Sequence, residues 1–348
     1  ARELAPALEP NLRPLFSVRT MAVKVAAVLI GIVAGASIGR EGPTVHVAMC
    51  VFMLAMEPFR RWGGVRVEPR SLIIAGSAAG LAAAFNTPLA GVTFAIEELS
   101  VDFGSSIKEY VLMSIIVAAI AAKAMYGEYT YFGSLSLAPG VPLKVTLFIG
   151  VLAGLAGSLF STAILRGNKF LERFGSGPGR YLAPMATAAA LLGVAYMAGI
   201  ETLGPGNEVS RGLTHGDVDS AGLLFPLSKL ATTLLSYWSG IAGGIFAPCL
   251  SAGSALGADV ARLMGAPVQS CALIGMAALL SGTIQAPITS FVIIFEMTGR
   301  HEMLVPVMLG SLLAFMTARL TGAEHLYRTL AKNYAPLLPE SAGKVPGA

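Results

Sequence analysis

The sequence predicts an all-α polytopic membrane protein, and three observations support this fold class. Charged residues make up only 13% of the 348 residues, whereas hydrophobic residues make up 55% and mean hydropathy is +0.71. A soluble chain of this length has too much surface for so few charges to cover. Apolar segments also follow one another with only short polar interludes, and one stretch of the chain recurs with breaks at matching places.

The apolar segments predict a nearly continuous series of helices. A helix needs about 20 residues to cross the hydrocarbon core, and several segments are long enough. The short segments 88–98 and 287–297 begin at proline and contain glutamate near their ends. They therefore predict helices that cross only part of the bilayer. In order, the predicted helices cover about 20–38, 44–58, 71–85, 88–98, 108–126, 143–165, 181–199, 224–240, 246–264, 270–284, 287–297 and 303–321.

The polar interludes are expected to be loops, and 204–219 is rich in turn-forming residues. Glycine is abundant and recurs at a spacing of four, which favours close packing of helices in lipid. These glycines are Gly31, Gly35 and Gly39, Gly76 and Gly80, Gly150 and Gly154, and Gly253 and Gly257.

An internal repeat relates residues 75–98 to residues 274–297 with a constant offset of 199. Duplicated halves with interrupted helices at matching places are typical of transporters, in which the substrate site lies between the repeats. We expect a first repeat at 1–135, a second at 136–335 and a disordered tail at 336–348. The matching positions are Gly76, Pro88 and Glu97 in the first copy and Gly275, Pro287 and Glu296 in the second.

Two related Gly–Pro motifs precede the repeated blocks, at 39–43 (Gly-Arg-Glu-Gly-Pro) and 244–248 (Gly-Ile-Phe-Ala-Pro). Proline fits the first turn of a helix, and glycine brings bare backbone close to a ligand. Free N–H groups at a helix start, together with the helix dipole, favour an anion without any full positive charge. Such partial charges bind an ion and still release it. The alternative is a pair of ordinary helix starts.

Glu41 lies between the glycines of the first motif, and a carboxylate at membrane depth is a functional candidate by default. At the start of a helix it can occupy the anion site as a tethered competitor, which protonation would release. Arg40 is expected to point away and brace the loop. Glu97 and Glu98 end the helix at 88–98, and at most one of them can face a pathway. Glu296 is interpreted as structural or interfacial.

Other classes of function find little support. The cysteines lie in apolar stretches without metal-ligand spacing, so we expect packing residues, no metal and no cofactor. The net charge of +4 is scattered, which argues against a nucleic-acid partner. An enzyme is not expected, because Ser239 in Trp-Ser-Gly lacks a nucleophile elbow. An inert scaffold would not need Glu41. The cysteines are Cys50, Cys249 and Cys271.

These motifs resemble the CLC chloride channels and transporters. The motif at 39–43 resembles that family's gating-glutamate motif, and the motif at 244–248 resembles its second anion-binding loop. The run GLAAAFNTPLAGVTFAIEEL at 80–99 is typical of bacterial members, and His325-Leu-Tyr327 is similar to the stretch that carries the pore tyrosine. The resemblance covers roughly residues 10–335 and implies a CLC-type fold with two inverted repeats of tilted, partly spanning helices.

The resemblance also implies roles for individual residues. Glu41 would be the external gating and proton-accepting glutamate, and Glu98 the internal proton-transfer glutamate. The hydroxyl of Tyr327 would contact the central anion, although an interfacial belt tyrosine is the alternative. Lys24 resembles a buried family lysine. Backbone N–H groups would hold the anion at Arg40, Glu41, Gly42, Ile245, Phe246 and Ala247.

The resemblance implies exchange of chloride for protons in a homodimer in the lipid membrane, most simply a bacterial inner (plasma) membrane. A passive voltage- or pH-gated chloride channel is the alternative, which Glu98 disfavours because family channels generally lack this glutamate. The family's Gly-Ser-Gly-Ile-Pro motif is expected upstream of Ala1, so the chain is expected to be N-terminally incomplete. Without that serine, a preference for chloride over nitrate stays open.

Overall fold

The computed structural model describes residues 15–61, 67, 69–99, 105–127, 130–133, 135, 140–171 and 179–332. Within these residues the chain is helical, with one isolated antiparallel bridge between Gly39 and Gly244 in place of any sheet. The expected tail at 336–348 lies outside the described residues.

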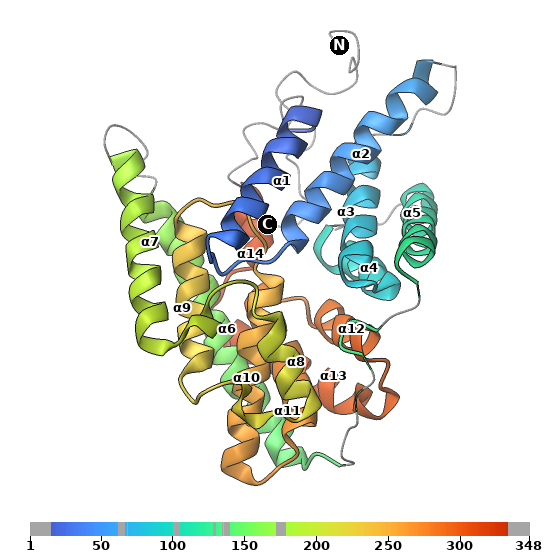
Figure 1. Cartoon of the computed structure of the whole chain (residues 1–348). Coiled ribbons are helices and arrows are strands. Elements are labelled where there is room, and N and C mark those ends of the chain that lie inside the picture. Colours follow the sequence, from blue (N-terminus) through green and yellow to red (C-terminus); the bar gives the residue numbers. More distant parts are fainter. Residues whose placement is uncertain are drawn as a thin grey trace.

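The helices follow the predicted order (Figure 1). Every predicted apolar segment overlaps with one helix, or with a helix and the short element that continues it, but the segment 20–38 extends past the end of α1 at Val33 into the loop before α2. The long elements are α1 (Val18–Val33), α2 (Glu41–Arg61), α3 (Pro69–Phe85), α5 (Ser105–Tyr126), α6 (Leu143–Leu171), α7 (Gly179–Ala198), α9 (Phe225–Trp238), α10 (Phe246–Met264), α11 (Val268–Ile284), α12 (Pro287–Thr298) and α13 (Leu304–Leu320). The short ones are α4 (Pro88–Phe94), η1 (Ala95–Leu99), η3 (Ile200–Thr202), α8 (Asn207–His215), η4 (Val218–Ser220), η5 (His301–Met303) and α14 (Leu326–Lys332).

The segment at 204–219 corrects one expectation, since it contains helix α8 and is not only a series of turns. Gly206 and Gly216 flank this helix, and both adopt the left-handed conformation that ends a helix or precedes its start. Val209 and Leu213 face the interior, whereas most other side chains of α8 are polar. The polar composition and the flanking glycines therefore hid an amphipathic helix.

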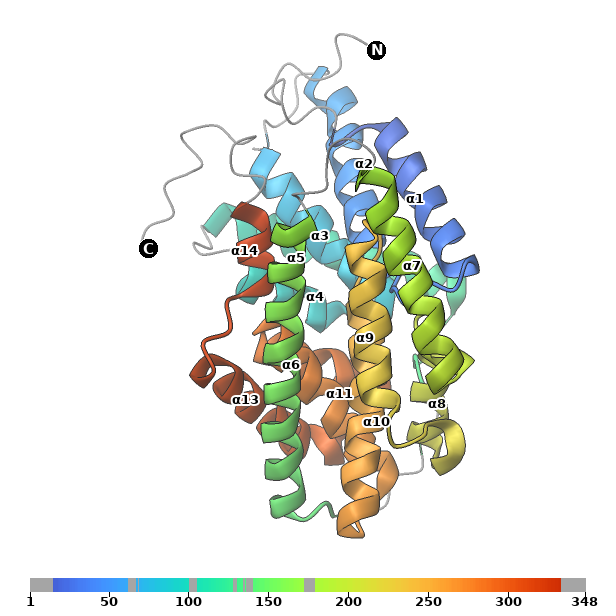
Figure 2. The ribbon, with the colours of Figure 1, turned by 90° about the vertical axis from the view of Figure 1, so that its left-hand side faces the viewer.

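Three helices are long and apolar enough to cross a membrane, within the residues that the structure describes: Leu143–Leu171, Tyr181–Ala198 and His301–Leu320. Several shorter apolar helices accompany them, including Ser71–Phe85 and Pro287–Thr298. Figure 2 shows α6 and α9 side by side, with α7 against the outside of α9 and α13 running obliquely across α6. This mixture of upright, tilted and short helices matches the predicted membrane architecture.

Helix α11 forms the centre of the core, where its residues from Ser270 to Ile284 are all buried. It packs against α6, α10 and α13, and close approach depends on glycine. A Cβ atom at Gly257 would overlap with the carbonyl oxygen of Cys271. On the opposite side, a Cβ atom at Gly80 would lie 2.8 Å from the Cα atom of Val45, so α3 packs equally closely on α2. These contacts confirm the predicted glycine packing at Gly80 and Gly257. Gly35 and Gly39 correct it, since they follow the end of α1 at Val33 and are not part of a helix.

The two copies of the repeat form the same local structure. Asn86 and Gln285 are 199 residues apart, and they are the two non-glycine residues with positive φ (56° and 61°) in the described chain. Each ends a long helix just before a short one begins at a proline.

The short helices α4 and α12 also cap each other. The carboxylate of Glu97 accepts hydrogen bonds from the N–H groups of Ile288 (2.9 Å) and Thr289 (2.6 Å) at the start of α12. The carboxylate of Glu296 accepts hydrogen bonds from Leu89 (3.0 Å) and Ala90 (2.8 Å) at the start of α4. Because the end of each helix meets the start of the other, the two copies run in opposite directions, as inverted repeats require. Glu296 is structural, in agreement with the prediction.

Candidate anion and proton site

The starts of α2 and α10 meet at the two Gly–Pro motifs. Gly39 and Gly244 exchange backbone hydrogen bonds, each 2.7 Å long. The loop before α2 is also held by α9, where Ser236 Oγ accepts a bond from the N–H of Ser37 (2.9 Å) and Thr233 bonds the Ser37 hydroxyl (2.9 Å). These hydrogen bonds hold the two helix starts together, so that their N–H groups surround one point and favour negative charge there.

The carboxylate of Glu41 lies in the space that the two glycines leave. A Cβ atom at Gly244 would stand 2.9 Å from Glu41 Oε2, and a Cβ atom at Gly39 would overlap with the same oxygen. Any other residue at Gly39 or Gly244 would therefore displace the carboxylate. The two glycines are needed for the space between the helix starts as well as for the turn.

Glu41 is 2% exposed. Its carboxylate receives hydrogen bonds from its own backbone N–H and from that of Ala247 at the start of α10. Oε2 is buried without a hydrogen-bond partner among the described residues. Two helix starts favour a small anion at the place where the Glu41 carboxylate lies. Because Oε2 has no hydrogen-bond partner in the described part of the chain, the carboxylate loses few hydrogen bonds when it leaves this place.

The second loop presents its backbone at the same place. Ile245, Phe246 and Ala247 are buried, and the first bond inside α10 runs from Cys249 N–H to the Ile245 carbonyl. The N–H groups of Phe246 and Ala247 therefore have no partner within the helix, and Pro248 has no N–H at all. The structure thus leaves two donors at this helix start.

Tyr327, on α14, reaches this region from the far end of the chain. Its ring stacks on that of Phe246, with ring centres 6.2 Å apart and planes at 26°. Glu41 and Glu98 both lie within electrostatic range of its hydroxyl. The structure therefore brings Tyr327 together with the second loop and with both predicted glutamates.

Glu97 and Glu98 differ in their contacts, because only Glu97 is used to cap a helix. The two residues lie in η1, a turn of π-helix that ends the short helix α4. Single π-helical turns often occur at functional sites. Glu97 is committed to capping α12, and Arg328 donates a hydrogen bond to its carbonyl oxygen (3.2 Å). Glu98 Oε2 is buried and has no hydrogen-bond partner among the described residues. The capping contact gives a physical reason to favour Glu98, the residue that the family resemblance implies.

Arg40 and Gly42 flank the glutamate but differ in surroundings. The Arg40 side chain is exposed and lines an open cavity, which fits the expectation that it points away. Its carbonyl accepts bonds from the N–H and hydroxyl of Thr44 in the first turn of α2. Gly42 lies against the second loop, since a Cβ atom there would be 3.4 Å from Gly244 Cα. The described contacts of Lys24 are elsewhere, with His46 and Cys50.

Sequence reasoning missed two aromatic residues and one lysine near the site. The rings of Phe85 and Phe94 lie 6.2 and 6.5 Å from that of Phe246. Lys229 is fully buried, and its Nζ donates to the carbonyl oxygens of Thr202, Leu203 and Gly204 at 2.9, 3.2 and 2.6 Å. A lysine inside the apolar run of α9 was a usable signal, whereas buried phenylalanines are ordinary core residues.

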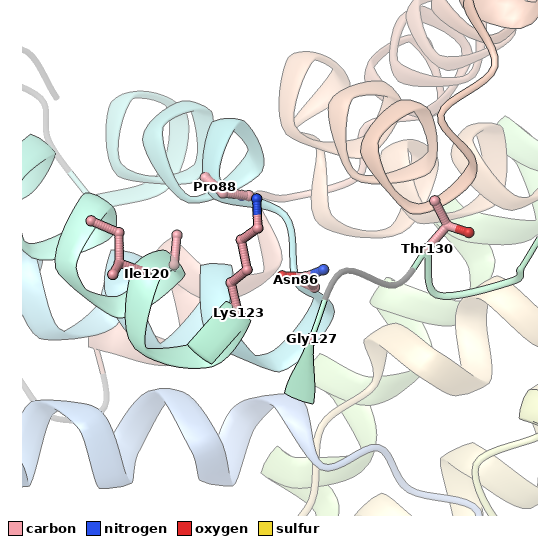
Figure 3. Close-up of a pocket in the computed structure, with 7 residues that line it drawn as sticks. Asn86, Pro88, Ile120, Lys123, Gly127 and Thr130 are labelled. Carbon is pink, nitrogen blue, oxygen red and sulfur yellow. The ribbon is translucent and has the colours of Figure 1, made fainter. Parts of the chain in front are cut away.

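Other features lie apart from this site. A cavity of about 590 Å³ opens at the end of α5, where Figure 3 shows the Lys123 side chain extending toward Pro88. None of the predicted site residues lines it. The three cysteines are buried and free, as expected of packing residues. Among the described residues, no group of three His, Cys, Asp or Glu side chains is placed to hold a metal.

Comparisons with known proteins agree with this architecture. Residues 2–319 match the family model described as voltage gated chloride channel. The chain is 34% identical to the H(+)/Cl(-) exchange transporter ClcA of Citrobacter koseri over 365 residues, covering 99% of this chain and 76% of the relative. It is also 34% identical to ClcA of Salmonella arizonae over 360 residues, covering 98% and 75% of the two chains.

Solved structures show the same fold. The chain resembles a slow cyanobacterial Cl-/H+ antiporter with a TM-score of 0.77 and 26% identity, over 93% of this chain and 77% of that one. It resembles a CLC-type fluoride/proton antiporter in fold, with a TM-score of 0.74 and 24% identity over 90% and 77% of the two chains. The chain is an integral membrane protein of the voltage-gated chloride channel family, the CLC channels and transporters.

Proposed function

We propose that this protein exchanges chloride for protons across the membrane. The observation that carries the proposal is the Glu41 carboxylate, which lies between two helix starts and receives a hydrogen bond from the N–H of Ala247. Its place is one that an anion would occupy. Relatives at 34% identity are named H(+)/Cl(-) exchange transporters, which supports the same activity here.

In this mechanism Glu41 is the gate. When it is ionised, its carboxylate fills the outer anion position and excludes chloride. A proton removes the charge that the helix starts attract, so the side chain leaves and chloride takes its place. The outer position then uses the N–H groups of Arg40, Glu41, Gly42, Phe246 and Ala247, and the central position uses Ile245, Phe246 and the Tyr327 hydroxyl.

Glu98 is the internal proton relay. A proton passes from the inner face to Glu98 and on to Glu41, while chloride moves in the opposite direction past Phe246 and Tyr327. Phe85 and Phe94, which contact Phe246, exclude chloride from the proton branch because an apolar wall offers an ion no solvation. The two routes therefore share Glu41 and separate toward the inner face.

A passive chloride channel is the second candidate, and the same site supports its anion pathway. Glu98 favours the antiporter, since a channel has no use for a second acid with a buried oxygen on a separate branch. The preference for chloride over nitrate is left to measurement, because the Gly-Ser-Gly-Ile-Pro motif does not occur among the 348 residues.

The remaining features of the proposal follow from the family. The repeats at 1–135 and 136–335 form one pathway, and two subunits associate as a homodimer with one pathway each. The ClcA relatives are bacterial, which supports a bacterial inner membrane as the location of this protein. It needs no cofactor besides the transported ions, and it is a carrier and not an enzyme.

The test is transport by the full-length protein in liposomes. Vesicles loaded with chloride are diluted into low chloride, and chloride efflux is followed with a silver electrode while a pH electrode follows protons. An antiporter shows chloride efflux down the imposed chloride gradient, together with proton uptake into the vesicles. Chloride efflux without proton movement would support a channel, and absence of both would reject anion transport.

A further inference from the structure

A second cavity, of about 270 Å³, opens beside the gate and carries charged residues that the transport mechanism has not used. It begins at Arg40, the residue directly before Glu41, and extends to the start of α8. The cavity is lined by Arg40, Tyr131, Phe132, Asn207, Glu208 and Arg211.

The charge of this cavity favours anions. Arg40, Arg211 and Glu208 are exposed side chains, and within the described residues neither guanidinium forms an ion pair. The cavity lining therefore carries two positive groups and one carboxylate. Glu208 also lies in the first turn of α8, where a carboxylate already interacts favourably with the helix start. The arginines keep their charge available for a diffusing ion.

The wall of the cavity is continuous with the aromatic residues at the anion site. Tyr131 packs edge-on against Phe132 (5.2 Å) and Phe85 (6.0 Å), and Phe85 in turn contacts Phe246. Phe132 is 2% exposed, so this wall is part of the core. Arg211 lies close to the turn at 130–133, where a Cβ atom on Gly133 would be 3.9 Å from its Nη2. The guanidinium of Arg211 therefore lies beside the turn that carries this aromatic wall.

We propose that this cavity is a capture site for small inorganic anions, which concentrates chloride beside the gate before Glu41 opens. The site rests on the proposed function, because the ion it collects is the one that the gate admits. Arg211 supplies the capturing charge, Arg40 links the cavity to the gate, and Glu208 limits affinity so that the ion moves on. Binding is electrostatic and without a closed coordination shell, so it accepts chloride, bromide and nitrate alike.

The test uses opposite charge changes in one cavity of the full-length protein in liposomes. Arg211→Gln is expected to raise the half-saturating chloride concentration about two- to three-fold at low ionic strength, the effect of one charge about 10 Å from the ion in near-water dielectric. Glu208→Gln is expected to lower it by a similar factor, and the double variant to return near the wild-type value. Arg211→Lys, which keeps the charge, is the matched control. The chloride-to-proton ratio is expected to be unchanged throughout.

Ionic strength gives a second readout. The shifts are expected to vanish near 1 M of an impermeant salt, where the Debye length is only about 3 Å. In Arg211→Cys, a positively charged thiol reagent is expected to restore chloride affinity and a negatively charged one to weaken it further. The native cysteines are buried, so the new thiol is the reactive one.

The possible failures are distinct. Wild-type protein without chloride flux would reject the proposed function itself. Normal wild-type flux with unshifted half-saturation in both Arg211→Gln and Glu208→Gln would overturn the capture site alone. Shifts of the same sign in both variants would also overturn it, because general damage to α8 has no charge dependence.

Discussion

The two copies of the repeat share their capping glutamates but differ at the residue that follows each of them. Glu97 and Glu296 occupy equivalent positions, and each caps the short helix of the other copy. One residue later, the first copy has Glu98 with a buried oxygen lacking a partner, and the second has Met297, which is 1% exposed in the apolar core. Duplication thus accounts for the pair of short helices that cap each other, whereas Glu98 occurs in only one of the two copies.

The two Gly–Pro loops show the same difference. Gly39 and Gly244 pair with each other, and Pro43 and Pro248 follow four residues later in each loop. Between them the first loop carries Glu41, whereas the second carries Phe246 at the matching place. One helix start therefore contributes a titratable group and the other a fixed apolar wall. Both helix starts supply N–H groups to the anion site, whereas a single titratable acid is enough for a gate.

The largest expected effect comes from removing the acid of the first loop. Glu41→Gln keeps the shape of the side chain but removes its charge and its titration. Chloride flux in liposomes is expected to become independent of pH between about 4 and 8, and coupled proton uptake to disappear. In the wild type, flux is expected to rise as pH falls, because protonation opens the gate. A normal pH response in the variant would count against the gating role.

Replacing Glu98 with the residue found in the second copy is expected to affect proton transport and to leave chloride transport intact. Glu98→Met places the residue found at Met297 on the proton branch, where it cannot titrate. Chloride flux is expected to persist while proton uptake is lost, as the two electrodes measure. Glu302→Gln, an exposed glutamate on η5, is the control and should leave coupling intact. Full coupling in Glu98→Met would refute the relay assignment.

Removing the reciprocal caps is expected to affect stability more than chemistry. Glu97 accepts three hydrogen bonds, two from N–H groups and one from the Thr289 hydroxyl, and Glu296 accepts two. Each charge-assisted bond contributes about 1.5–3 kcal/mol, so Glu97→Ala should cost more than Glu296→Ala, by about one such bond. Thermal unfolding in detergent measures the difference. The symmetric interpretation fails if Glu296→Ala proves the more harmful.

The smallest effect is expected at Tyr327. Tyr327→Phe keeps the stacking on Phe246 and removes only the hydroxyl, a neutral hydrogen bond of about 1 kcal/mol. Chloride affinity is expected to fall about five-fold, with proton coupling and thermal stability retained. Chloride titration by calorimetry measures the affinity. An unchanged affinity would mean that the hydroxyl does not contact the ion.

Much of this arrangement was predictable from local sequence signals. Apolar runs located the helices, and Pro88 and Pro287 marked the short ones, because proline fits a first turn and a membrane helix must satisfy its own backbone. The offset of 199 indicated the duplication before any contact was known. The two Gly–Pro motifs and a glutamate at membrane depth were sufficient to suggest the anion site.

Other features depend on contacts between distant segments. Helix α8 escaped prediction because its polar face and flanking glycines resemble a loop. Helix spacing alone left open which of Glu97 and Glu98 faces a pathway, and the contact that distinguishes them is the capping of α12 by Glu97, 191 residues from its partner Ile288. The roles of Phe85 and Phe94 near the site were equally invisible, since each matches an ordinary buried residue until its neighbours are known. Lys229, inside the apolar run of α9, was a usable signal that sequence reasoning did not use.

The sequence by itself determined the membrane class, the apolar helices, the repeat and the acids available for chemistry. These follow from hydrophobicity, proline and glycine, which act on the backbone locally. Only the tertiary structure decided that the two copies run in opposite directions, that two helix starts share one carboxylate, and that Glu98 keeps a buried oxygen without a partner. Such features arise from hydrogen bonds and packing between segments far apart in the chain, which no local pattern records.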